Sequence, residues 1–93
     1  MLIGTLLVEV HIPQSGSLKE KRTVIKSMIQ RIQNRFNVSI AEINNKDLWQ
    51  RATVGVAMVG DNRAYLERKM QLLINFMDDD PRWEVIKVET DWC

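Results

Sequence analysis

Hydrophobic and polar positions alternate along four segments of the chain, which is typical of strands with one buried face. In the first segment the even positions from Leu6 to Ile12 are all apolar, whereas the odd positions are mixed. Pro13 predicts the end of this strand, because proline has no backbone N–H for the next ladder bond. The pattern predicts strands near residues 2–12, 38–43, 51–59 and 84–91.

Two further segments repeat apolar residues every three or four positions, which predicts amphipathic helices near residues 18–36 and 62–79. The run from Ser17 to Glu20 matches a capping box, in which both side chains bond free amides of the first turn. The turn ending at Asn62 provides a cap for the second helix, and Pro81 predicts its end. The expected core holds the inward-facing residues Leu6, Val8, Val10, Ile25, Ile29, Ile32, Ile40, Val54, Val56, Leu66, Met70, Leu73, Ile86 and Val88.

The order of the segments is β-α-β-β-α-β, and it predicts the fold. The short connection at residues 44–50 makes the two middle strands an antiparallel hairpin, and each crossover through a helix is expected to be right-handed. An α+β ferredoxin-like sandwich meets both conditions, with a four-stranded antiparallel sheet in the order 4-1-3-2 and two helices on one face. We expect a single domain over residues 1–93, with the other face of its sheet open.

The composition excludes several classes of protein and site. One cysteine, Cys93, and one histidine, His11, rule out an intrachain disulfide framework, a multi-cysteine zinc site and two-histidine metal motifs. We therefore expect no cofactor and no metal. No apolar run approaches the ~20 residues that span a bilayer, and the N-terminus lacks the features of a signal peptide. These observations favour a cytoplasmic protein without a membrane partner.

The charge is close to neutral overall, at +1, but it is unevenly distributed. Residues 1–60 carry 8 Lys or Arg against 4 Asp or Glu, and the excess is concentrated in the predicted first helix. Free amides at a helix start and nearby cations attract phosphate. The predicted anion or RNA contact consists of Ser15, Gly16, Ser17, Lys19, Lys21, Arg22 and Lys26, with the ammonium of Lys21 extending to solvent. The alternative is a solvated helix face with no ligand.

The open face of the predicted sheet has no aromatic residue at its outward positions, so the base-stacking platform of RNA-recognition motifs is missing. Its small and apolar residues instead favour a homodimer interface made by Leu7, Ala41, Ile43, Gly55, Ala57 and Val85. We expect Trp49 and Trp83 to cover the core, and His11 and the acidic run at 78–80 to be surface groups. No residue is assigned a catalytic role.

Several motifs resemble one bacterial family over almost the whole chain. They are the runs at residues 11–13, 17–22 (Ser-Leu-Lys-Glu-Lys-Arg), 35–39, 47–52 (Asp-Leu-Trp-Gln-Arg-Ala) and 59–61. Together they resemble the YlxP-like proteins, a family of unknown function. The resemblance implies a ferredoxin-like fold and no established activity. Members of that family are often encoded beside translation initiation factor two and ribosome-binding factor A, which implies a role near ribosomes or RNA.

From these observations we expect a small non-catalytic binding module that contacts RNA or the ribosome through its basic first helix. Two alternatives remain open. One is a phosphate-handling enzyme of the acylphosphatase kind, which shares this size and topology, with Arg22 as the nearest candidate for the cradle arginine. The loop before Arg22 does not match the cradle motif. The other alternative is a homodimer with a purely structural or regulatory role.

Overall fold

The computed structural model describes residues 1–93. In chain order the elements are β1 (Leu2–His11), α1 (Leu18–Arg35), β2 (Ser39–Asn44), β3 (Arg51–Gly60), α2 (Arg63–Asp78) and β4 (Glu84–Trp92). Every bound lies within one residue of its predicted position. The local patterns of apolar spacing, capping and proline therefore located all six elements.

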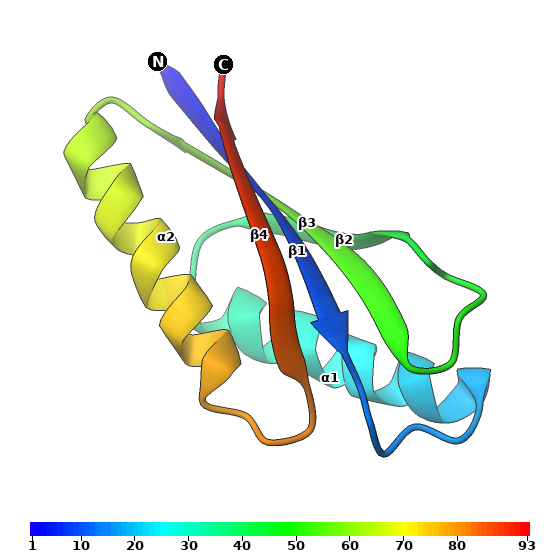
Figure 1. Cartoon of the computed structure of the whole chain (residues 1–93). Coiled ribbons are helices and arrows are strands. Elements are labelled where there is room, and N and C mark those ends of the chain that lie inside the picture. Colours follow the sequence, from blue (N-terminus) through cyan, green and yellow to red (C-terminus); the bar gives the residue numbers. More distant parts are fainter.

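The four strands form one antiparallel sheet in the order β2-β3-β1-β4, which is the predicted order counted from the other edge. Figure 1 shows α1 and α2 on the same side of this sheet, with the two chain ends side by side. Ile3 and Cys93 donate backbone hydrogen bonds to each other's carbonyls, at 3.3 and 2.9 Å. The ferredoxin-like fold is confirmed. Neither helix has the length and apolarity needed to cross a membrane.

The core lies between the sheet and the two helices, where 17 hydrophobic residues are buried together. Most predicted core residues are among them, including Val8, Ile32 and Leu73, which are fully buried. Ile29 and Val88 are only partly buried at the margin of this cluster. Ile86 does not belong to the core, because 48 % of its surface is exposed.

A β-bulge in the pairing of β1 with β4 explains this error. The register shifts between Glu9 and Val10, so that Val8 lies opposite Val88 while Val10 lies opposite Val85. A bulge places one extra residue on one strand, and this resets the alternation of its side chains. Val85 therefore packs against the core and leaves the predicted dimer face, whereas Ile86 is exposed. Alternation alone placed both residues on the wrong face.

The two tryptophans predicted to cover the core differ in the structure. Trp83 is buried, and its Nε1 donates a hydrogen bond of 2.7 Å to the carbonyl of Met77. That prediction is confirmed. Trp49 lies in the connection between β2 and β3 with 56 % of its surface exposed, so its predicted role in the core is wrong.

Candidate functional site

The loop between β1 and α1 forms the predicted cap at Ser17, with the Glu20 carboxylate reaching back to Gly16, one residue before the N-cap. The backbone N–H of Glu20 donates to the hydroxyl of Ser17 at 3.1 Å, and the N–H of Gly16 donates to the Glu20 carboxylate at 2.6 Å. The Glu20 carboxylate therefore occupies the position that an external anion would take at Gly16. The structure does not support Gly16 and Ser17 as anion contacts.

Ser15 is also committed to the loop. It is buried, and its hydroxyl donates a hydrogen bond of 3.0 Å to the carbonyl of Ser17. Its own carbonyl accepts a hydrogen bond of 3.0 Å from the side chain of Gln50, which comes from the β2–β3 connection. Ser15 thus ties two loops together and presents no group to a ligand, contrary to the sequence prediction.

Lys21 is fully buried, whereas the sequence predicted that its ammonium would extend to solvent. Its Nζ donates hydrogen bonds to the carbonyls of Asn45 (2.8 Å), Lys46 (3.1 Å) and Arg51 (3.2 Å). An ammonium has three N–H donors, and these carbonyls use all of them. Glu42 Oε2, which lies 3.1 Å from Nζ and accepts no hydrogen bond, balances the charge as an ion pair. Lys21 is therefore a structural residue and cannot reach RNA.

Three of the predicted contacts remain available on α1. Lys19, Arg22 and Lys26 are exposed, and none of them lies within ion-pair distance of a carboxylate. Spacings of three and four residues place them on one flank of the helix. We call these three residues the basic flank. Arg22 lies on this exposed flank and not in the loop before the helix, so the structure shows no phosphate cradle of the acylphosphatase kind around it.

Arg31, on a different side of α1 from the basic flank, contacts the buried carboxylate of Asp80. Asp80 is 8 % exposed, and its oxygens accept hydrogen bonds from Arg31 and Arg82. Hydrogen bonding by Arg82 lowers the pKa of Asp80, outweighing the opposite effect of burial, and the charge of Arg31 adds to the lowering. Asp80 was predicted to lie at a solvated helix end, and this is wrong. Arg31 also lies 5.4 Å from the ring centre of Phe76, so its charge has partners within the fold.

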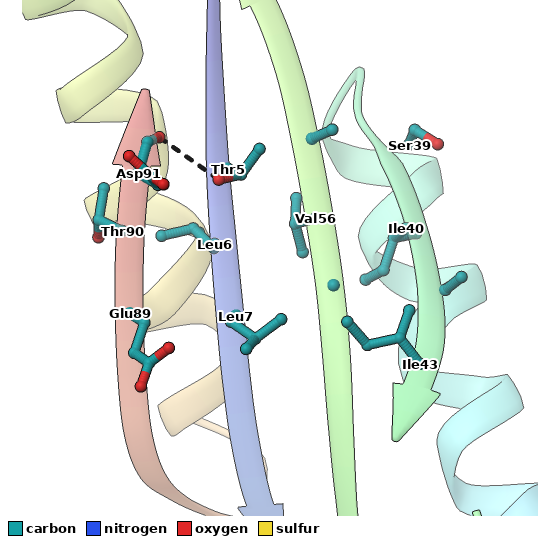
Figure 2. Close-up of a pocket in the computed structure, with 13 residues that line it drawn as sticks. Thr5, Leu6, Leu7, Ser39, Ile40, Ile43, Val56, Glu89, Thr90 and Asp91 are labelled. Carbon is teal, nitrogen blue, oxygen red and sulfur yellow. Dashed lines mark hydrogen bonds between the residues drawn. The ribbon is translucent and has the colours of Figure 1, made fainter. Parts of the chain in front are cut away.

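The open sheet face carries a shallow apolar groove of about 520 Å³. Leu7 of β1 and Ile43 of β2 point toward each other across β3 (Figure 2), and both are exposed. A Cβ at Gly55 would lie 3.0 Å from the Ile43 side chain, so this glycine accommodates Ile43 of its own chain. Gly55 is thus already covered by its own chain, and Leu7, Ala41, Ile43 and Ala57 supply the groove's accessible apolar surface.

The charged residues of the open face are mostly paired. Arg51 lies 3.1 Å from the Glu9 carboxylate, and His11 Nδ1 lies 3.8 Å from Glu84. Glu9, on the same strand as His11, is therefore engaged by Arg51. The face has no nucleophile arranged beside His11, and no group of three or more His, Cys, Asp or Glu is placed to hold a metal ion.

Comparison with known proteins agrees with the sequence motifs. Residues 3–90 match the family described as "Protein of unknown function (DUF503)". The chain belongs to this DUF503 family. It is also 43 % identical over 91 residues to the uncharacterized protein YlxP of Bacillus subtilis (strain 168), which covers 98 % of this chain and 99 % of that protein. The resemblance to YlxP-like proteins is thereby confirmed.

A solved structure is also similar to this DUF503 protein. It is a ferredoxin-like protein from an uncultured marine organism, described as dimeric. The two share 13 % sequence identity with a TM-score of 0.48, and the alignment covers 100 % of this chain and 94 % of that one.

Proposed function

We propose that this DUF503 protein is a single-domain, non-catalytic, cytoplasmic module that contacts RNA phosphates through the basic flank of α1. One observation carries the proposal: Lys19, Arg22 and Lys26 are the exposed cations of this helix that lack a carboxylate partner and share one flank. Lys21 and Arg31 are bound to Glu42 and Asp80. Arg35, the remaining exposed cation of the helix without a carboxylate partner, lies over the Phe76 ring away from this flank. This difference supports the basic flank as the surface that contacts a ligand.

The charge of the open sheet face supports this choice of surface. Beside the groove, β4 contributes the carboxylates Glu89 and Asp91, which repel phosphate, and Lys87 is paired with Glu89 at 2.9 Å. The Glu89 carboxylate raises the pKa of Lys87 through a hydrogen bond. RNA is thus better accommodated on the helical side. Contacts to phosphate alone are independent of sequence and strongly dependent on salt.

The test compares the wild type with the double variant Lys19→Ala, Arg22→Ala in binding to a single-stranded oligouridylate and to ribosomal subunits. Each phosphate contact on a single strand contributes about 0.7 to the slope of log affinity against log salt. The double variant should flatten that slope by about 1.4 and lower the affinity at low salt. Both side chains are exposed, so the variant should remain folded.

The matched control is Arg63→Ala, Arg68→Ala, which removes the same charge from exposed positions of α2. If both double variants reduce binding equally, the effect comes from net charge and not from the basic flank. If the α1 variant binds with unchanged affinity and slope, the basic flank is a solvated helix face and the proposal is wrong.

A second proposal concerns the open sheet face, which we infer to pair with a second copy of the chain. The four strands have 10, 6, 10 and 9 residues, and at ~3.3 Å per residue and ~4.8 Å between strands they span a face of roughly 550 Å². This approaches the ~800 Å² per partner of a standard interface. The exposed apolar side chains of Leu7 and Ile43 lie at the middle of this face, in the groove of Figure 2.

Analytical ultracentrifugation of two single variants, Ala57→Glu and its control Ala64→Glu, tests this interface. Ala57 lines the groove, whereas Ala64 is exposed on α2, so the same charge is added on opposite sides of the molecule. We expect Ala57→Glu to shift a wild-type dimer to monomer, because it would bury an unpaired carboxylate. Ala64→Glu should leave the dimer intact. A wild-type monomer at high micromolar concentration would exclude the interface.

A further inference from the structure

Trp49 is an exposed aromatic side chain that the proposed function does not yet use. With Leu48, Gln50, Arg51 and His11 it lines a shallow hollow of about 630 Å³ at one end of the sheet. We propose that the Trp49 ring stacks on an unpaired base of a single-stranded RNA whose phosphates contact the basic flank. This inference rests on the proposed function and names its substrate class as single-stranded RNA.

The connection that carries Trp49 is held in place on both sides. Lys21 binds the carbonyls of Asn45, Lys46 and Arg51, as described above. Gln50 donates side-chain hydrogen bonds to the carbonyls of Pro13 (3.3 Å) and Ser15 (3.0 Å). The backbone before and after Trp49 is thus anchored to α1 and to the loop that precedes it. An anchored aromatic residue loses less conformational freedom when a ligand binds.

The same contacts hold the Trp49 connection against the buried side of the first turns of α1, whereas the basic flank lies on the exposed side of those turns. Lys21 lies in the same two turns of α1 as Lys19 and Arg22, and its ammonium binds the Trp49 connection directly. Figure 1 shows this connection, between β2 and β3, beside the start of α1. A single strand bound to the basic flank would pass around the start of α1 to reach the Trp49 ring, so the inference requires a strand several nucleotides long.

The surroundings of Trp49 favour a nucleobase over a protein side chain. Three of the five residues that line the hollow are polar, and Arg51 is half exposed although one of its nitrogens contacts Glu9. A nucleotide offers a flat π-face for the indole, and its phosphates would be contacted by the basic flank because Arg51 is paired with Glu9.

The experiment measures binding of a single-stranded oligoadenylate and of an RNA duplex of equal length to four proteins: the wild type, Trp49→Ala, Trp49→Phe and Leu48→Ala. Loss of one stacking contact lowers single-strand affinity by roughly 5- to 150-fold. We expect this loss for Trp49→Ala on the single strand alone, with an unchanged salt slope because no phosphate contact is removed. Trp49→Phe should retain most of the affinity, since it keeps an aromatic face.

The controls separate stacking from simple apolar contact and from the phosphate contacts. Leu48 lines the same hollow but has no π-face, so Leu48→Ala should lower the single-strand affinity far less than Trp49→Ala does. Equal losses for Leu48→Ala and Trp49→Ala would reject stacking in favour of an apolar contact. RNA binding that depends on the basic flank but is unaffected by Trp49→Ala would reject this inference alone. No RNA binding by the wild type would reject both proposals.

Discussion

Replacing Lys21 by methionine tests whether a buried ion pair holds the β2–β3 connection against α1. Methionine has a similar length and an apolar end, so it preserves packing in the helix while removing the ammonium. The change leaves Glu42 Oε2 without its counter-charge and removes three hydrogen bonds to the carbonyls of Asn45, Lys46 and Arg51. The perturbation is therefore confined to one charge and its partners.

The unfolding free energy that Lys21→Met is expected to lose is large in relation to the total stability of the protein. Removing one partner of a buried ion pair costs about 3–5 kcal/mol, because the remaining charge stays buried without compensation. A chain of 93 residues has a free energy of unfolding of about 5–14 kcal/mol, at 0.05–0.15 kcal/mol per residue. Lys21→Met should therefore remove between a fifth and all of this stability.

Urea unfolding, followed by the combined tryptophan fluorescence of Trp49, Trp83 and Trp92 and by far-UV circular dichroism, measures the loss of unfolding free energy. With an m value of ~1.5 kcal/mol/M, a loss of that size lowers the midpoint by about 2–3 M. Lys26→Met is the matched control, because Lys26 is an exposed lysine of the same helix and should leave the midpoint nearly unchanged. If Lys21→Met itself fails to fold, Lys21→Met, Glu42→Leu should recover part of the stability, since neither charge remains. A loss below ~1 kcal/mol for Lys21→Met would refute the reasoning, because a buried carboxylate left alone costs more than that.

Three further substitutions test the packing of α1 and its contact with Asp80. Asp80→Asn should cost about 1–3 kcal/mol at neutral pH through weakened hydrogen bonds from Arg31 and Arg82. The folded-state pKa of Asp80 lies below its ordinary value of 3.8, so the stability difference between Asp80→Asn and the wild type should be constant above about pH 5 and shrink as the pH falls through the lowered pKa. Urea midpoints between pH 2 and 7 measure this difference. A stability difference independent of pH would contradict the assignment of a lowered pKa to Asp80. Ile32→Ala should cost ~2–5 kcal/mol of unfolding free energy because Ile32 is fully buried. Ile29→Ala should cost about half as much or less because Ile29 is only partly buried. Equal thermal or urea destabilisation by the two substitutions would show that both side chains are equally enclosed.

Local patterns in the sequence determined the elements, their order and the fold. The cap at Ser17, with Glu20 reaching back, and the cap at Asn62 form where predicted, since each depends on residues no more than three or four positions apart. The alternating strands and the short connection at 44–50 left one sheet order consistent with right-handed crossovers, and it is the order observed. These features follow from the sequence because they arise from contacts close along the chain and from general rules of chain topology.

The tertiary structure alone decided which of the candidate residues remain free to act. Lys21 lies among other basic residues in the sequence, yet its ammonium is bound by residues more than twenty positions away. The bulge in β4, which exchanged Val85 and Ile86, depends on pairing with β1 across the whole chain. The exposure of Trp49 likewise depends on how its connection is anchored by Lys21 and Gln50. Such contacts join positions far apart in the chain, so no local pattern of apolar and polar residues records them.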